Sequence, residues 1–243
     1  MTRHATPPGP PPAVSAAQVL LIDADDTLWE NNILFERVID AYLDWLTPPG
    51  LTRAQVRTEL NAIEHANAVT LGYGSQVFLL SLAECAAKLT GRPTTDADRE
   101  HIELLAAPLL RRGGIELIPG VADTLTALGA RHELRLVTKG DLDEQTAKVA
   151  ASGIGDHFRS VHVVPEKNTA TYLALIAELG LDPATAWMIG NSPKSDILPA
   201  REAGLRAVFI PHEHTWVLEH DVVDPADGGI LQLASFAELL HHF

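Results

Sequence analysis

The second half of the chain alternates between short apolar runs and longer segments of helical period. Beyond residue 120, apolar side chains recur every three or four positions in the longer segments, as on one face of an α-helix. This alternation is typical of an α/β protein with a doubly wound parallel sheet covered by helices on both faces. We expect helices over residues 121–130, 142–151, 170–179, 197–203 and 236–241, and strands over 133–137, 160–164, 186–189 and 207–210.

A further strand, Val19–Ile22, precedes this region and leads directly into a cluster of acids. Asp23, Asp25 and Asp26 follow it, together with Thr27. Carboxylates this close repel one another, so a buried strand end must compensate with a bound cation, a positively charged side chain or a shifted pKa. An acidic turn without a chemical role is the alternative, because a DxDxT pattern alone is a short motif.

Polar residues also follow the later strands. In doubly wound sheets, ligands bind at the carboxyl ends of the strands, near the point where the strand order reverses. Thr138 and Lys139 follow one expected strand, Lys167 follows the next, and Asn191 and Asp196 follow the one after that. Each residue alone has an ordinary alternative, as a strand end, a solvent-exposed lysine, a turn or an acid at a helix N-terminus. Together they bring different functional groups to one edge of the sheet.

These groups could carry out group transfer together. Asp23, on a rigid strand end, could be a nucleophile toward phosphorus or an activated carbon. Asp25 could protonate a leaving oxygen and then deprotonate an attacking water. Asp23 and Asp196 are candidate ligands of Mg²⁺, which prefers oxygen ligands. Thr138 and Lys167 could stabilise the oxygens on which negative charge develops.

An all-helical region separates the first strand from the alternating part. Four stretches of helical period lie within residues 33–112, and proline or glycine follows each of them, at Pro48, Gly72, Gly91 and Gly113. We therefore expect a catalytic core of residues 18–32 and 113–243, interrupted by a helical domain over 33–112. Residues 1–17 are rich in proline and alanine, and we expect them to form a disordered leader outside the fold.

Composition narrows the class of protein. The 243 residues, 46% of them hydrophobic, can bury one sizeable core and a smaller second one. A net charge of −14 disfavours nucleic acid and anionic membranes as partners, but leaves a small phosphorylated metabolite as a candidate if positive charge is concentrated locally. The single cysteine, Cys85, cannot form an internal disulfide, which fits a cytoplasmic location. No apolar run approaches the length of a membrane span.

The polar residues occur in an order that resembles the four motifs of the haloacid dehalogenase superfamily. The helical region is similar to that superfamily's type-1 cap, and the resemblance covers nearly everything after residue 18. It implies a Rossmann-like core with an inserted helical cap. The residues that carry it are Asp23-x-Asp25-x-Thr27, Thr138, Lys167 and Gly190-Asn191-Ser192 with Asp196.

The resemblance also implies roles. Asp23 would form an aspartyl-phosphate, and Asp25 would be the general acid and base. Mg²⁺ would be bound by the side chains of Asp23 and Asp196 and by the backbone carbonyl of Asp25. Thr138 and Lys167 would hold the transferred phosphoryl group.

Three positions depart from the superfamily's pattern. Asp26 stands where many members have glycine, so the turn is either less free to flex or simply tolerates an exposed acid. Asn191 replaces a second acid, as a neutral metal ligand or a group behind the ligands. Lys139 stands where asparagine is common, either touching substrate phosphate or turned to solvent. We include Lys139 and Asn191 in the expected substrate-binding set.

Asp25 distinguishes the candidate reactions. A departing halide needs no proton, whereas an alkoxide leaving a phosphate ester benefits from an acid. We therefore predict a magnesium-dependent phosphatase acting on a small phosphorylated metabolite. The alternatives are a phosphomutase similar to β-phosphoglucomutase and, less favoured, a 2-haloacid dehalogenase or a non-catalytic binding module.

Two further sets of residues could shape the site. The polar residues of the helical region are candidates for substrate contacts: Glu64, His65, Asn67, Tyr73 and Gln76. His212 and His214 lie together after the last expected strand and weakly suggest a transition-metal site. The alternatives for these histidines are an ordinary polar loop or a loop that borders the site entrance.

Overall fold

The computed structural model describes residues 17–110 and 115–243 and contains a six-stranded sheet in the order β3-β2-β1-β4-β5-β6. All neighbouring strands pair in parallel, which confirms the doubly wound α/β fold. The strand order reverses at β1, which lies between β2 and β4. The strands are β1 (Val19–Ile22), β2 (Glu133–Lys139), β3 (Ser160–Val164), β4 (Ala186–Gly190), β5 (Arg206–Phe209) and β6 (Ile230–Gln232).

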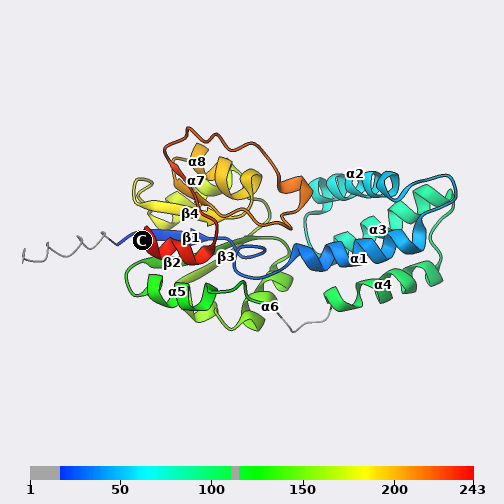
Figure 1. Cartoon of the computed structure of the whole chain (residues 1–243), viewed down its shortest axis with the longest axis horizontal. Coiled ribbons are helices and arrows are strands. Elements are labelled where there is room, and N and C mark those ends of the chain that lie inside the picture. Colours follow the sequence, from blue (N-terminus) through cyan, green and yellow to red (C-terminus); the bar gives the residue numbers. More distant parts are fainter. Residues whose placement is uncertain (1–16, 111–114) are drawn as a thin grey trace, which may run out of the picture.

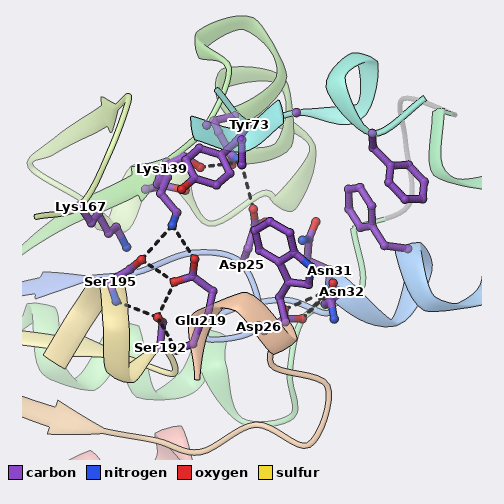
Figure 2. Close-up of a pocket in the computed structure, with 18 of the residues that line it drawn as sticks. Asp25, Asp26, Asn31, Asn32, Tyr73, Lys139, Lys167, Ser192, Ser195 and Glu219 are labelled. Atoms are coloured by element: carbon purple, nitrogen blue, oxygen red, sulfur yellow. Dashed lines mark hydrogen bonds and ion pairs between the residues drawn. The ribbon is translucent and has the colours of Figure 1, made fainter. Parts of the chain in front are cut away.

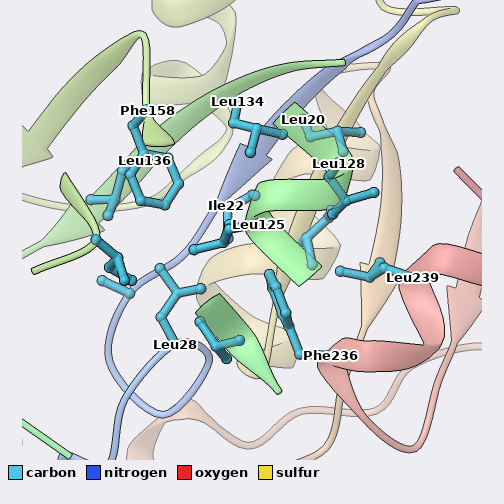
Figure 3. Close-up of a cluster of buried hydrophobic side chains, with 14 of the residues drawn as sticks. Leu20, Ile22, Leu28, Leu125, Leu128, Leu134, Leu136, Phe158, Phe236 and Leu239 are labelled. Atoms are coloured by element: carbon cyan, nitrogen blue, oxygen red, sulfur yellow. The ribbon is translucent and has the colours of Figure 1, made fainter. Parts of the chain in front are cut away.

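Helices cover both faces of this sheet, and alternate residues of β1 face opposite ways. Leu20 and Ile22 belong to the apolar cluster on one face, which Figure 3 shows together with Leu125, Phe158 and other side chains. Leu21, between them, belongs to the cluster on the other face. The helices of this part of the chain are α5 (Val121–Gly129), α6 (Leu142–Ser152), α7 (Thr169–Leu179) and α8 (Leu198–Glu202).

Several boundaries differ from those predicted. Strand β2 runs two residues further, because Thr138 and Lys139 still pair with β3. The helix expected over 197–203 begins earlier, with a π-helical turn at Pro193–Ile197, and α8 then ends at Glu202. The expected final helix is a 3-10 helix, Phe236–His241.

The region between β1 and α5 folds into four helices with an apolar cluster of its own. The buried side chains include Tyr42, Leu60, Leu82 and Cys85, the free thiol. Figure 1 shows these helices, hereafter the helical unit, beyond one end of the sheet. They are α1 (Asn32–Leu46), α2 (Arg53–Leu71), α3 (Ser75–Thr90) and α4 (Asp96–Leu110).

Parts of the sequence-based predictions fall outside the described residues. These are Gly113, which was expected to follow the fourth helix, and the leader up to residue 16. Among the helices that the structure describes, none combines the length and the apolar character needed to cross a membrane.

Candidate active site

A cavity of about 180 Å³ lies between the carboxyl ends of the strands and the helical unit. Figure 2 shows part of its lining. The residues of the predicted site all line this one cavity, although they come from four separate segments of the chain. They are Asp23, Asp25, Thr138, Lys139, Lys167, Asn191 and Asp196.

Lys167 joins two of the predicted carboxylates at the centre of the site. Its Nζ lies 2.5 Å from Oδ1 of Asp23 and 2.7 Å from Oδ1 of Asp196. The lysine side chain is only 2% exposed, so this contact is shielded from solvent. Asp196 also needs a glycine beside it, because a Cβ at Gly190 would lie 2.2 Å from its Oδ2. Glycine at position 190 thus leaves the space that the buried carboxylate of Asp196 occupies.

The charges of this group depend on one another. Burial, together with repulsion from Asp196, raises the pKa of Asp23, and Lys167 opposes the rise. For Lys167, burial favours the neutral amine, but the two carboxylates outweigh it and raise the pKa of the lysine. The ammonium therefore stays charged in the metal-free protein and compensates for the repulsion that the sequence implied.

The same carboxylates fit a divalent cation. Asp23 and Asp196 each approach one nitrogen atom, so their oxygens converge, and Mg²⁺ takes oxygen ligands of this kind. A second group converges nearby, formed by Asp26, Glu30 and His212. Of its three members only Asp26 lines the cavity, so the Asp23 and Asp196 pair is the better candidate for an ion that acts there.

Asp25 is held by groups that sequence reasoning missed. Its carboxylate accepts hydrogen bonds from Trp29 Nε1 at 2.6 Å, from Gln145 Nε2 at 3.0 Å and from Lys148 Nζ at 3.0 Å. Burial opposes ionisation, but Lys148 and the three hydrogen bonds outweigh it and lower the pKa of Asp25. Gln145 and Lys148 stand three residues apart on α6, a spacing that places both on one helix face. Nothing in the sequence showed that this face meets Asp25.

Asp26 supports the first turn of α1. Its Oδ1 accepts hydrogen bonds from the backbone N–H groups of Asn31 and Asn32, both at 2.9 Å. The residue has a φ of 60° and is buried, so the alternative of an exposed acid is wrong. Burial raises the pKa of Asp26 to about 6. This acid therefore anchors the helical unit to the end of β1.

Lys139 is also not turned to solvent, since its side chain is 13% exposed. Its Nζ donates to Glu219 at 2.7 Å and to Ser195 at 2.8 Å, and it lies 4.2 Å from the centre of the Tyr73 ring. Glu219 in turn accepts from the hydroxyl groups of Ser192 and Ser195, and Figure 2 shows the network. Glu219 ends the short 3-10 helix Val217–Glu219 between β5 and β6, where no sequence pattern indicated a site residue.

Asn191 and Thr27 link Asp23 to the loop after β5. The Thr27 hydroxyl lies 3.0 Å from Asp23 Oδ2 and 3.3 Å from Asn191 Oδ1. The Asn191 amide donates to Thr215 Oγ1 at 2.9 Å. Thr215 and Trp216 of this loop line the cavity, whereas His212 instead lies 3.4 Å from Glu30.

The turn between α2 and α3 brings the helical unit onto the core. The Tyr73 hydroxyl donates to Glu166 Oε2 at 2.6 Å, and the Ser75 hydroxyl and N–H both contact Glu144 Oε2. Of the polar residues predicted to contact substrate from this unit, Glu64 and Tyr73 line the cavity. Asn67 instead bonds to neighbouring side chains of α3.

Comparison with known proteins identifies a family and two partial relatives. The model of the haloacid dehalogenase-like hydrolase family matches residues 17–204. Protein CbbY of Rhodobacter capsulatus is 31% identical over 148 residues, which are 57% of this chain and 61% of that protein. Phosphoserine phosphatase of Thermus thermophilus is 30% identical over 82 residues, which are 32% of this chain and 33% of that enzyme. The chain therefore matches these relatives over less than two thirds of their length.

Solved structures resemble this chain over most of its length. A haloacid dehalogenase-like hydrolase from Xanthomonas campestris matches with a TM-score of 0.79 at 28% identity, covering 93% of this chain and 94% of that one. L-2-haloacid dehalogenase from Xanthobacter autotrophicus matches with a TM-score of 0.60 at 16% identity, covering 93% and 97%. The second likeness shows a common fold and says nothing of a common substrate.

Proposed function

This chain belongs to the haloacid dehalogenase-like hydrolases, and we propose that it is a magnesium-dependent phosphatase acting on a small phosphorylated metabolite of the cytoplasm. The observation that carries this proposal is the convergence of Asp23, Lys167 and Asp196 in the cavity that Asp25 also lines. Asp23 could act as the nucleophile and Asp25 as the acid, and the buried ammonium of Lys167 lies beside Asp23. This combination suits the transfer of an anionic phosphoryl group.

The reaction would proceed in two steps. An oxygen of Asp23 attacks phosphorus while the bond to the leaving oxygen breaks, and the Asp25 carboxyl gives its proton to that oxygen. Asp25 then takes a proton from a water molecule that attacks the aspartyl-phosphate, which releases inorganic phosphate and restores Asp23. The lowered pKa of Asp25 favours its basic form, which the second step needs. A phosphate dianion beside Asp25 raises its affinity for the proton that the first step needs.

Other residues of the cavity would bind and position. Thr138 and Lys167 hold the phosphoryl oxygens, Lys167 by charge and Thr138 by its hydroxyl. Lys139 and Asn191, the other members of the predicted substrate-binding set, also line the cavity, and they donate hydrogen bonds to Glu219 and Thr215 respectively. We assign them to positioning the loops around the site.

Mg²⁺ would be held by the carboxylates of Asp23 and Asp196 and by the backbone carbonyl of Asp25. When bound, it would supply positive charge next to the phosphoryl oxygens. The donor chemistry supports this assignment, since each of these ligands offers an oxygen.

The helical unit would act as a cap on a core of residues 18–32 and 113–243. Its apolar cluster is separate from those of the sheet, and it supplies one wall of the cavity. A cap over residues 33–112 would exclude bulk water from the reacting groups and choose the substrate.

The test is phosphate release from p-nitrophenyl phosphate and a panel of small phosphate esters, with Mg²⁺ at neutral pH. Asp23→Asn should reduce kcat by about 10³-fold or more, because the amide cannot act as the nucleophile. Asp143→Asn, an exposed change at the start of α6, is the matched control and should retain activity. Removing divalent metal with a chelator should abolish turnover.

Each contrary result has a distinct meaning. Activity that survives Asp23→Asn rejects the nucleophile, and activity without divalent metal rejects the metal's role. Isomerisation of a sugar phosphate without phosphate release identifies a phosphomutase instead. Halide release from a 2-haloacid, with no ester hydrolysed, identifies a dehalogenase.

A further inference from the structure

Glu64 brings a carboxylate into the wall of the cavity that the helical unit forms. It lies on α2, is 8% exposed and lines the same cavity as Asp23 and Lys167. Its Oε2 is fully buried and has no hydrogen-bond partner in the part of the chain that the structure describes. Buried polar atoms are ordinarily hydrogen-bonded, so this oxygen requires an explanation.

No cation forms an ion pair with Glu64 among the described residues, although the charge of Arg57 partly offsets the effect of burial on its pKa. Arg57 of α2 is close enough to affect it, but forms a two-bond ion pair with Glu36, at 2.7 and 3.0 Å. The lysines of the cavity are each paired with other carboxylates on the sheet side: Lys139 with Glu219, Lys148 with Asp25, and Lys167 with Asp23 and Asp196.

The surroundings of Glu64 make an isolated charge costly. The other cavity-lining residues of the helical unit are largely apolar and include Phe35, Ile39, Ala68, Val77 and Phe78. Burial in this setting raises the pKa of Glu64 to about 7. A buried carboxylate becomes favourable when an opposite charge that also donates hydrogen bonds is placed beside it.

We propose that Glu64 binds a protonated amino group of the substrate, so that the preferred substrate is a small phosphate monoester with a primary ammonium group. This inference rests on the proposed phosphatase function, because it requires the phosphate to lie at the strand ends near Lys167. The ammonium then lies against α2, at the wall formed by the helical unit. The opposite charges at its two ends fix the orientation of the substrate.

An ammonium group satisfies this site better than a hydroxyl group does. A hydroxyl donates one hydrogen bond and leaves the charge of the carboxylate uncompensated, whereas an ammonium donates up to three and carries the opposite charge. The cavity volume of about 180 Å³ suits a compact molecule. A free carboxylate on the substrate, placed beside Glu64, would be repelled.

The decisive experiment compares three esters of similar size: phosphoethanolamine, 2-hydroxyethyl phosphate and propyl phosphate. For the wild-type protein, we expect kcat/KM for phosphoethanolamine to exceed that for propyl phosphate by about 100-fold, with the hydroxyl ester between them. In Glu64→Gln the ratio should fall to near one. Glu84→Gln is the matched control, since Glu84 contacts Asn67 outside the cavity lining, and it should keep the wild-type ratio.

A binding measurement separates this inference from the proposed function. Calorimetry with the Asp23→Asn protein should show phosphoethanolamine binding more tightly than propyl phosphate, and the double variant with Glu64→Gln should lose the difference. If no ester is turned over, the phosphatase proposal fails, and calorimetry still decides the role of Glu64.

Three results overturn the role of Glu64. They are equal kcat/KM for the three esters in the wild-type protein, a hydroxyl ester that matches phosphoethanolamine, and a preference that persists in Glu64→Gln. If Glu64→Gln does not fold, Glu64→Leu replaces it in both measurements, since leucine removes the charge and the acceptor together.

Discussion

The two walls of the cavity differ in whether their buried carboxylates are paired with a cation. On the sheet wall, Asp23 and Asp196 share Lys167, and Asp25 is held by Lys148. On the wall formed by the helical unit, Glu64 has a buried oxygen without a partner among the described residues. Groups of the same chemical type are thus compensated on one side of the cavity and left uncompensated on the other.

We infer from this difference that the sheet wall carries out the reaction, whereas the wall formed by the helical unit selects the substrate. The sheet wall keeps its carboxylates and lysines in fixed relative positions before a substrate arrives, which is the condition for electrostatic preorganisation. On the wall with Glu64, only a bound molecule can form an ion pair with the buried carboxylate. The free protein bears the cost of this buried charge, and a ligand with a positive group removes that cost and is therefore preferred. Variants that remove one charge from each wall should therefore have opposite effects on stability.

Removing the lysine of the sheet wall should have the largest effect. Lys167→Met leaves Asp23 and Asp196 buried without their cation. Losing one partner of a buried pair costs about 3–5 kcal/mol, so we expect the free energy of unfolding in metal-free buffer to fall by that amount. Urea denaturation monitored by circular dichroism measures it, and phosphatase activity should be lost in the same variant.

The control is Lys88→Met in the helical unit, where Lys88 forms an exposed ion pair with Glu59. An exposed pair is screened by water, so the loss should be below about 1 kcal/mol. Similar losses for the two variants would show that Lys167 does not compensate buried charge, and the contrast between the walls would disappear.

Glu64→Gln should have a smaller effect of the opposite sign. Burial raises the pKa of Glu64 from 4.5 to about 7, so the folded protein binds this proton more tightly than the unfolded chain does. The stability that this proton contributes is present below the unfolded pKa and is lost as the pH rises through the folded pKa. The wild-type protein should therefore lose about 2 kcal/mol relative to Glu64→Gln between about pH 5 and pH 8.

Urea unfolding of both proteins across this pH range tests the expectation. Asp23 and Asp26 also have raised pKa values, but they are present in both proteins and cancel in the difference. Parallel stability curves for the two proteins would mean that Glu64 is compensated in solution. The selectivity argument would then lose its energetic basis.

Sequence reasoning found the sheet wall because strand ends are predictable positions. Thr138 lies near the carboxyl end of β2, and Lys167 and Asp196 follow β3 and β4. A parallel sheet brings the ends of its strands to a common edge. Lys148 and Glu219 lie elsewhere, one within α6 and the other in the short 3-10 helix Val217–Glu219. Their contacts depend on how a helix and a loop pack onto the sheet, which no local pattern encodes.

The length of each helix or strand decided whether it could be predicted from the sequence. The four helices of the helical unit span 15 to 19 residues, long enough for a clear helical period. Strand β6 has three residues, too few to show an alternation, and it was missed. Glu64 was named as a substrate candidate because it is one of the scattered polar residues in a region of mostly apolar helix faces. Its lack of a hydrogen-bond partner became visible only in the folded structure.

Asp26 provides the last and smallest test, because it connects the two walls. It has a positive φ and accepts hydrogen bonds from the first backbone amides of α1. Glycine adopts this φ without strain but cannot accept those hydrogen bonds. Asp26→Gly therefore distinguishes the cost of the backbone conformation from the benefit of the carboxylate.

We expect Asp26→Gly to lower the free energy of unfolding by about 1 kcal/mol, because losing the acceptor at the start of α1 outweighs the relief of backbone strain. Asp26→Asn keeps an acceptor oxygen and a residue type that tolerates positive φ, so it should lose less than the glycine variant. Urea denaturation of both variants measures the difference. A glycine variant as stable as the wild type would mean that the carboxylate does not anchor α1. The position of Glu64 over the strand ends would then depend on the contacts of Tyr73 and Ser75 with the core instead.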